Sequence, residues 1–275
     1  MLAYLILVHR YPDQFFRLFQ SIYHPANFYW IHVDQKSESW IHDSVRQYLS
    51  GYPNVSIAES RKVVWSGYSM VDVTLEGIKD ALRQGDSWQW LINLSGQDFP
   101  LKSQTAIMEF LSTSTCKGYM KSGDQRKERP DTLHRIEYFH LEANNKVFRL
   151  PSKQSFPTNI IPYIGSQWFN LSRDICEFII SPGALNQFEP LFKHTLVPDE
   201  SFFTTMLLNS DYSNSIVNDN KRLIEWAPFS KLKKRPRVLT RDDLPIIRSS
   251  TDLFARKFDE TVDSSILDYI EDQIH

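Results

Sequence analysis

Short hydrophobic runs alternate with longer amphipathic stretches between residues 1 and 110. The runs are rich in β-branched and aromatic residues, which favours strands, whereas the stretches repeat apolar residues at helical spacing. The predicted strands are Ala3–Val8, Phe28–Val33 and Trp88–Leu94, and the predicted helices are Pro12–Tyr23, Ser37–Leu49 and Ser69–Leu82. Because strands and helices alternate, we predict an α/β fold with a mostly parallel central sheet flanked by helices.

The pattern changes in the second half of the chain. Gly118–Pro162 is charged and polar, and Asn144-Asn145 separates two β-like runs, as a hairpin turn would. Helices are predicted over Arg173–Ile180, over Asp199–Leu208 and from Ser264 to the end of the sequence. No internal repeat or Gly/Ser linker divides the chain, so we predict one continuous domain over residues 1–275.

The composition is that of a soluble globular protein, with 41% hydrophobic and 23% charged residues among 275. A formal net charge of -2 provides no field that would attract nucleic acid, and none is expected as a partner. Two cysteines, Cys116 and Cys176, are too few for a disulfide framework or a Cys-based zinc site and favour a reducing compartment. The apolar run Leu2–Val8 is too short for a membrane span.

Several common chemistries are excluded by spacing. The sequence contains no G-x-G-x-x-G, no P-loop, no G-x-S-x-G and no H-x-x-x-H, which argues against classical dinucleotide binding, P-loop phosphoryl transfer, a hydrolase elbow and a zinc enzyme. No two aspartates are separated by a single residue, so the D-x-D pair that holds a divalent cation against a nucleotide-sugar diphosphate is also missing. We therefore expect no metal site.

Six blocks of residues carry a positive signal. They are Tyr29–Ser37, Val64–Gly67, Leu91–Pro100, Gly165–Phe169, Pro198–Phe203 and Leu253–Asp259. In this order they resemble glycosyltransferase family 14, the metal-independent GT-A glycosyltransferases that include core-2/I-branching β-1,6-N-acetylglucosaminyltransferases and peptide O-xylosyltransferases. The resemblance covers most of the chain. It implies a single GT-A-type, Rossmann-like catalytic domain: residues 1–115 mainly bind the nucleotide sugar, 116–230 mainly serve the acceptor, and 231–275 hold the diphosphate-binding segment and a C-terminal helix.

Glu200 follows a Pro-Asp pair at the expected start of a helix. The plain alternative is a first-turn carboxylate that complements the helix dipole. In the similar enzymes, the glutamate of this block is the catalytic base that takes the proton from the acceptor hydroxyl. Asp199, its neighbour, is interpreted as a capping residue.

Departure of a nucleoside diphosphate requires neutralisation of its growing negative charge. Without D-x-D, fixed cations must do this, and the resemblance assigns the task to Arg256 and Lys257, which lie between the aromatic Phe254 and Phe258. A solvated surface pair is the alternative. The flanking aromatic residues favour a segment fixed by packing.

A basic run lies upstream of this pair, and related transferases place a further diphosphate-binding arginine there. Its members are Lys231, Lys233, Lys234, Arg235, Arg237 and Arg241. The sequence does not choose among Lys234, Arg235 and Arg237. A solvated loop, or contact of Lys231–Arg241 with an anionic membrane surface, are the alternatives.

The nucleotide-binding residues are expected near strand ends. Asp34 resembles the family's uridine contact, and Trp65 would face the uracil. His9 is expected close to the nucleotide, and Asp98 is expected near the donor sugar. The alternatives are a helix-initiating turn for Asp34 and core packing for Trp65. For His9 the alternative is a strand terminator, and for Asp98 it is a turn residue.

Trp168, with Ser166 in the same block, is expected to line the acceptor or donor-sugar pocket, and a core role is the alternative for Trp168. The branching enzymes usually carry Tyr in this block, so the tryptophan agrees better with the xylosyltransferases. The acceptor-binding residues of the branching enzymes have no convincing counterparts around Lys221–Trp226. The acceptor therefore stays open.

The sequence thus predicts an inverting, metal-independent glycosyltransferase without a cofactor, using a UDP-sugar donor with N-acetylglucosamine or xylose and a glycan or lipid-linked glycan acceptor. The scarcity of cysteines and the absence of an anchor sequence suggest a bacterial, cytoplasmic enzyme of surface polysaccharide synthesis, peripheral at the inner face of the membrane. Two alternatives are kept. One is a non-catalytic nucleotide- or carbohydrate-binding protein of the same fold, and the other is a glycoside hydrolase using Glu200 with Asp98.

Overall fold

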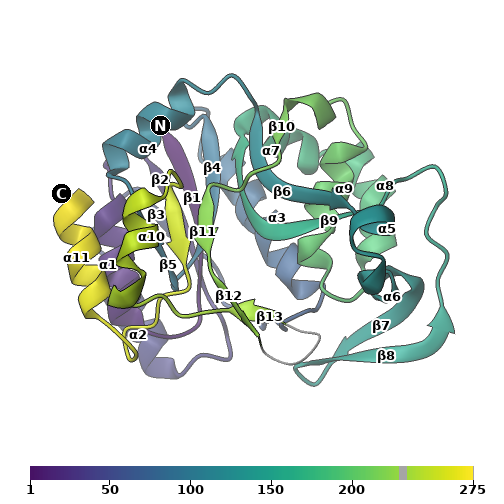
Figure 1. The fold of residues 1–275 in the computed structure, drawn as a ribbon, viewed down its shortest axis with the longest axis horizontal. Helices are drawn as coiled ribbons and strands as arrows, with labels where there is room; N and C mark the ends of the chain where they lie inside the picture. Colours follow the sequence, from purple (N-terminus) through teal and green to yellow (C-terminus); the bar gives the residue numbers. More distant parts are fainter. Residues whose placement is uncertain (229–233, 275) are drawn as a thin grey trace.

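A seven-stranded sheet with the strand order β10-β6-β9-β4-β1-β2-β3 forms the centre of the protein (Figure 1). The structure is a computed structural model that describes residues 1–228 and 234–274. The strands of this sheet are β1 (Leu2–Val8), β2 (Phe28–Val33), β3 (Val55–Ile57), β4 (Trp90–Ser95), β6 (Gly118–Asp124), β9 (Tyr163–Ser172) and β10 (Ile216–Val217). Strands β4, β1, β2 and β3 run parallel, and β9 is antiparallel to both of its neighbours. The mostly parallel sheet predicted from the sequence is confirmed.

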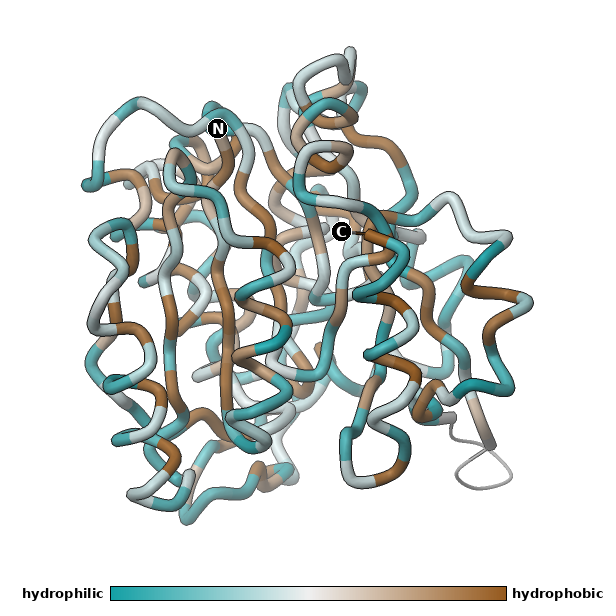
Figure 2. Tube along the Cα trace, turned by 90° about the vertical axis from the view of Figure 1, so that its left-hand side faces the viewer, coloured by the Kyte–Doolittle hydropathy of each residue, from teal (hydrophilic) through white to brown (hydrophobic). Residues whose placement is uncertain are grey.

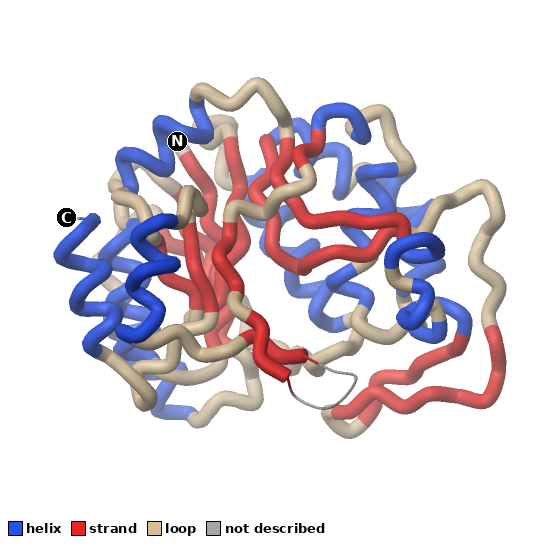
Figure 3. Tube along the Cα trace, in the orientation of Figure 1, coloured by secondary structure: helices blue, strands red, loops and turns tan. Residues whose placement is uncertain are grey.

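Helices cover both faces of this sheet (Figure 3). The α-helices are α1 (Pro12–Ile22), α2 (Ser39–Leu49), α3 (Ser69–Arg83), α4 (Gln104–Ser112), α5 (Gln125–Glu128), α6 (His134–Glu137), α7 (Arg173–Ile179), α8 (Pro182–Phe192), α9 (Phe202–Leu208), α10 (Leu244–Ser249) and α11 (Ser265–Ile274). Short 3-10 turns lie at η1 (Pro130–Thr132), η2 (Pro198–Glu200), η3 (Ser213–Ser215) and η4 (Arg241–Asp243).

The alternation of side chains along β1 builds two hydrophobic cores. Tyr4 and Ile6 pack with α1, α2 and α11 on one face, and Ala3 and Leu5 pack with α3, α7 and α9 on the other. Successive side chains of a strand point to opposite faces, so a strand covered on both sides is apolar throughout. Figure 2 shows long hydrophobic stretches along the inner strands.

Three smaller sheets complete the fold. They are β11 (Arg222–Ile224), β14 (Phe254–Arg256) and β5 (Asp98–Pro100) in the order β11-β14-β5; β12 (Trp226–Pro228) with β13 (Lys234–Pro236); and β7 (Tyr138–Ala143) with β8 (Lys146–Lys153). The predicted turn at Asn144 and Asn145 is confirmed, because both residues have a left-handed backbone (φ 49° and 60°) between β7 and β8. The β7-β8 hairpin projects from the body of the molecule (Figure 1).

Two predicted element boundaries are wrong. The strand predicted from Trp88 begins at Trp90, because its partner β1 begins at Leu2, which lies opposite Trp90. The helix predicted from Asp199 begins at Phe202, because Pro198–Glu200 forms a separate 3-10 turn. The other predicted helices and strands lie within a few residues of their observed positions.

Candidate active site

The carboxyl ends of β1, β2 and β4 meet at one edge of the central sheet. His9 follows β1, Asp34 follows β2, and Ser95 ends β4. The backbone amide of Asp34 donates a 2.9 Å hydrogen bond to the carbonyl of Val8, which joins the first two strand ends. Open α/β sheets bind their ligands at this edge, so His9 and Asp34 lie where the sequence places the nucleotide.

Asp34 shapes the turn that follows β2. Its Oδ1 accepts the backbone N–H of Lys36 at 2.9 Å, and its Oδ2 lies 3.5 Å from Lys36 Nζ. Asp34 thus lies in a turn, as its alternative interpretation expects, but this turn does not initiate the helix, because α2 begins at Ser39 with Glu38 at its N-cap. The contact of Asp34 with a nucleoside stays a prediction.

The His9 ring is surrounded by positive charge. Burial, followed by the charges of Arg10 and Lys257, lowers the pKa of His9 to about 4, against a weaker opposing effect of Asp34. The residue nevertheless keeps an exposed surface. His9 is therefore a neutral side chain at physiological pH and can hydrogen-bond a ligand without adding charge.

Asp98 and Arg222 form a fully buried ion pair beside the end of β4. Both side chains have 0% exposure. Asp98 Oδ2 also accepts the backbone N–H (2.7 Å) and the hydroxyl (2.6 Å) of Ser95, while Arg222 donates to the carbonyl of Asn93 at 3.0 Å. The carboxylate of Asp98 thus both closes the turn after β4 and neutralises a buried guanidinium.

Arg256 reaches the same carboxylate from β14. Its Nη1 lies 3.7 Å from Asp98 Oδ2, and its guanidinium lies 4.2 Å from the centre of the Trp168 ring. Arg222 lies 4.8 Å from the centre of the same ring. Trp168 is buried and contacts two cations, so the core and pocket interpretations of this tryptophan are compatible. One carboxylate faces two guanidinium groups here, which leaves positive charge for an anionic ligand.

The packing expected around Arg256 and Lys257 is confirmed, because Phe254 and Phe258 on either side of the pair are completely buried. The side chain of Arg256 is 11% exposed. Burial, and then the charges of Arg10 and Arg256, lower the pKa of Lys257. The pair is therefore held in a fixed, cation-rich position rather than on a solvated loop.

Replacing Asp98 by Asn should destabilise the protein by about 3–5 kcal/mol, because Arg222 would be left as a buried charge without its counterion. Urea unfolding measures this loss. The matched control is Asp268→Asn at the ion pair of Arg17, in which Asp268 is 64% exposed and the expected change is about 0–1 kcal/mol. If the two variants lose the same free energy of unfolding, the buried ion pair does not stabilise the protein more than the exposed one.

Glu200 lies in η2, which directly precedes α9 in the sequence. Its Oε2 accepts a 2.7 Å hydrogen bond from Arg135 Nη1, and its side chain is 35% exposed. The η2 turn packs against β9, the strand that carries Trp168, and the backbone N–H of Val197 donates to Ser66. Glu200 is therefore an oriented and accessible carboxylate in a turn that packs against β9.

Asp199 does not cap α9, which corrects the sequence interpretation. The helix begins at Phe202 with Ser201 at its N-cap, and Oδ1 of Asp199 has no hydrogen-bond partner. Burial and the charge of Glu200 raise the pKa of Asp199 to about 7. Asp199 thus lies beside the candidate base, and the charge of Arg135, the partner of Glu200, opposes the rise in the Asp199 pKa.

Trp65 and Ser166 are both accessible. The Trp65 side chain is 80% exposed, so the core interpretation of this residue is wrong and its ring is free to stack. Ser166 lines a hollow of about 430 Å³ between the extended ends of β6 and β9, the α5 region and the β11-β12 segment. Arg222 and Trp226 also line this hollow.

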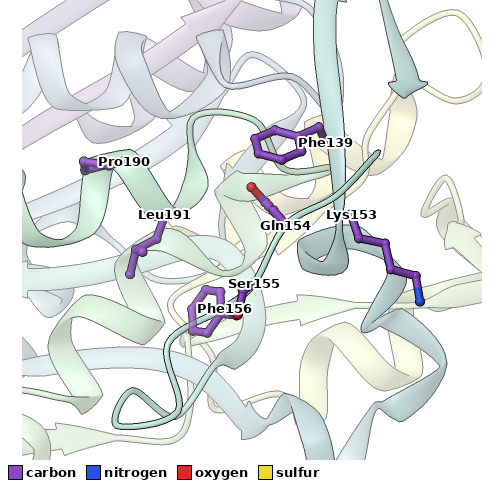
Figure 4. Close-up of a pocket in the computed structure, with 7 residues that line it drawn as sticks. All are labelled: Phe139, Lys153, Gln154, Ser155, Phe156, Pro190 and Leu191. Carbon is purple, nitrogen blue, oxygen red and sulfur yellow. The ribbon is translucent and has the colours of Figure 1, made fainter. Parts of the chain in front are cut away.

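A second hollow of about 340 Å³ lies where the β7-β8 hairpin meets α8 (Figure 4). Its lining residues are Phe139, Lys153, Gln154, Ser155, Phe156, Pro190 and Leu191. None of them belongs to the predicted site.

The arginines of the basic run make different contacts. Arg237 forms two hydrogen bonds with Asp243, from Nη1 to Oδ2 at 2.8 Å and from Nη2 to Oδ1 at 2.5 Å. Arg235 is exposed on β13, and its charge contributes to the lowered pKa of Lys257. Lys231 and Lys233 lie outside the described residues. Of the two arginines, Arg235 is therefore the one that the structure brings electrostatically close to the cationic pair.

Sequence reasoning missed Arg222 and Arg135. Arg222 lies on β11, whose pairing with β14 joins segments that are distant in the sequence. Arg135 lies in the polar middle segment, where nothing in the local pattern points to Glu200. Both are partners of predicted carboxylates, so only the three-dimensional arrangement identifies them.

Within residues 1–228 and 234–274, no cluster of three or more His, Cys, Asp or Glu side chains could hold a metal ion. The described helices also include none that is long and apolar enough to cross a membrane.

Comparison with known proteins then identifies the family. The model of the Core-2/I-Branching enzyme family matches residues 2–248 of the chain. The chain belongs to this family. The GT-A-type α/β fold predicted from the sequence agrees with this Core-2/I-Branching membership and with the mostly parallel sheet flanked by helices.

Curated relatives of this Core-2/I-Branching chain are xylosyltransferases. A xylosyltransferase of Ciona intestinalis is 30% identical over 290 residues, which cover 100% of this chain and 34% of that protein. Xylosyltransferase 2 of Homo sapiens is 30% identical over 291 residues, covering 98% and 33%. The chain therefore spans about a third of the length of these relatives.

Solved structures resemble this Core-2/I-Branching chain more distantly. The galactosyltransferase LgtC, in complex with donor and acceptor sugar analogues, has a TM-score of 0.44 at 8% identity and covers 100% of this chain and 96% of that chain. Residues 1–349 of TarS from S. aureus give a TM-score of 0.40 at 12% identity, covering 78% and 57%.

Proposed function

We propose that this chain is an inverting glycosyltransferase that moves xylose or N-acetylglucosamine from its UDP form to a hydroxyl of a glycan acceptor. The observation that carries the proposal is the packed, cation-rich pair Arg256 and Lys257 beside the carboxyl ends of the central strands. Membership of the Core-2/I-Branching family and the similarity to xylosyltransferases support it, and the names of these relatives favour xylose.

In the proposed reaction, the acceptor hydroxyl oxygen attacks the anomeric carbon while the bond from that carbon to the diphosphate oxygen breaks. The electron pair of this bond leaves with UDP. Arg256 and Lys257 would stabilise the developing negative charge without the help of a divalent metal, because fixed donors need no reorganisation during the step. Arg222 and Asp98 hold Arg256 in place through the shared carboxylate and the Trp168 ring.

Glu200 would take the hydroxyl proton as the oxygen attacks. Its hydrogen bond with Arg135 fixes one carboxylate oxygen and leaves the other to accept the proton. Attack opposite the leaving group in a single displacement gives a product with inverted anomeric configuration.

The donor would extend from the strand ends to β9. His9, Asp34 and the exposed ring of Trp65 would bind the nucleoside, and Trp168 and Ser166 would contact the transferred sugar or the acceptor. The hollow beside Ser166 provides room for an acceptor glycan, including a lipid-linked one. Location in the cytoplasm, with Lys231–Arg241 against an anionic membrane surface, belongs to the same proposal.

The alternative of a glycoside hydrolase using Glu200 with Asp98 requires two available carboxyl groups. Asp98 is completely buried and pairs with Arg222, so it offers no such second group. A non-catalytic binding protein would not need Glu200 to be accessible and oriented.

Purified protein should release UDP slowly from UDP-xylose or UDP-N-acetylglucosamine in buffer containing EDTA, and faster when a glycan acceptor is present. Because cationic side chains replace a metal in the proposal, EDTA should change the rate by less than about twofold. Coupled detection of UDP measures the rate, and proton NMR of the product gives the anomeric configuration. Absence of turnover with every UDP-sugar would favour the binding protein, and loss of turnover that Mn²⁺ restores would overturn the metal-independent mechanism.

A further inference from the structure

Arg10, near the N-terminus of the sequence, contributes a further cation beside Arg256 and Lys257. It follows His9 at the end of β1, directly before α1. The side chain is only partly exposed, and its Nε is buried without a hydrogen-bond partner. The sequence pattern gave Arg10 no role, because it stands at the boundary between a strand and a helix.

Two neighbours hold the Arg10 guanidinium in position. Nη2 donates to Gln97 Oε1 at 3.1 Å, and the guanidinium lies 5.0 Å from the centre of the Tyr11 ring. Tyr11 has a left-handed backbone (φ 53°), a conformation that costs energy for a residue with a side chain and often occurs at functional sites.

The same neighbours connect Arg10 to the segment that carries Lys257. Gln97 is buried, and its side-chain Nε2 donates to the backbone carbonyl of Phe258 at 3.0 Å. The backbone carbonyl of Gln97 accepts the backbone N–H of Phe258 at 2.9 Å. Tyr11 donates its hydroxyl to Asp259 at 3.0 Å. Arg10 and Lys257 are thus fixed relative to one another by a network of buried and half-buried hydrogen bonds.

The nearby carboxylates offset only part of this positive charge. Asp259 accepts hydrogen bonds from the Tyr11 and Thr261 hydroxyls, and its charge also acts on Lys257. Asp98 is shared between Arg222 and Arg256, so these two carboxylates face the four cations Arg10, Arg222, Arg256 and Lys257. Arg10, Arg256 and Lys257 are close enough for their charges to act on His9 together. Preorganised cations of this kind, with few free counterions, fit a ligand that carries several negative charges.

We propose that Arg10 binds the diphosphate of the donor together with Lys257, from the β1 side of the site. The assignment rests on the proposed function, and it adds a third cation to the pair that the sequence identifies. Its guanidinium can offer N–H groups to phosphate oxygens while Gln97 holds the other edge. The nucleoside itself needs no contact with Arg10.

The test compares Arg10→Gln and Arg10→Lys with the wild-type protein by isothermal titration calorimetry against UDP, UMP and uridine. Arg10→Gln should weaken UDP binding by about 10- to 100-fold, because a charged hydrogen bond is lost, and should change uridine binding by less than about twofold. Arg10→Lys should recover part of the loss. Arg46→Gln, at an exposed arginine on α2, is the matched control and should bind UDP like the wild type.

Melting temperatures of the free variants separate binding from folding. A second variant, Gln97→Met, removes the acceptor that holds Arg10 and should weaken UDP binding less than Arg10→Gln does. Unchanged UDP binding in Arg10→Gln, or equal losses for UDP and uridine, would overturn the assignment of Arg10 and leave the proposed function intact. If wild-type protein does not bind UDP at all, the proposed function and the assignment both fail.

Discussion

Glu200→Gln is expected to reduce sugar transfer by about 10²–10⁴-fold while UDP binding stays at the wild-type level. The amide keeps the shape of the carboxylate and can still accept the hydrogen bond from Arg135, but it cannot take a proton from the acceptor hydroxyl. Initial rates at saturating donor and acceptor measure the loss, and calorimetric titration with UDP checks that the donor site is intact.

The neighbouring carboxyl supplies the control. Asp199→Asn changes an acid one residue away, which lacks a partner at Oδ1 and makes no hydrogen bond to Arg135. This variant should retain most of the transfer activity. Glu200→Gln with unchanged turnover, or an equal loss in both variants, would remove Glu200 from the role of base.

Replacing Arg256 and Lys257 together by Ala is expected to lower the transfer rate by at least about 10²–10³-fold, the effect typical of losing one preorganised donor. UDP binding should weaken far more than uridine binding, because the proposed mechanism assigns these two charges to the diphosphate and not to the base. Titration with both ligands, together with rates of transfer, measures the two effects.

A second adjacent Arg-Lys pair in the chain offers a matched control. Arg126 and Lys127 lie on α5, where both are exposed. Their double replacement by Ala removes the same charge and should leave UDP binding and transfer near the wild-type level. If the Arg256/Lys257 double variant loses UDP and uridine affinity equally, the pair does not serve the leaving group.

The sequence predicted β1, β2 and β4 of the central sheet well because these strands are buried on both faces, whereas it did not predict β3, β6, β9 and β10. The runs from Leu2 and Phe28 are almost entirely apolar, and each is followed by an amphipathic helix, a pattern that few other folds produce. The positions of His9 and Asp34 follow from the same pattern, since they are the first polar residues after these strands.

The parts that sequence reasoning missed depend on contacts between distant segments. The partner of Asp98 is Arg222, and the partner of Glu200 is Arg135. Neither arginine has a local periodicity or spacing that marks it, because a buried ion pair is defined only when two elements pack. The error at Asp199 has a local cause: a proline and two acids are typical of a helix start, and here they form a 3-10 turn that ends before α9.

The order in which the chain is synthesised determines when the leaving-group site can form. β14 pairs with β5, so Phe254 lies opposite Pro100 and Arg256 lies opposite Asp98. A nascent polypeptide that has left the ribosome as far as β9 has therefore completed most of the central sheet but still lacks Arg256 and Lys257. Contacts between such distant segments form slowly, because a long loop must close first. Under the proposed function, nucleotide binding would be a late event in the biogenesis of this protein, and a premature stop before β14 would yield a chain without Arg256 and Lys257.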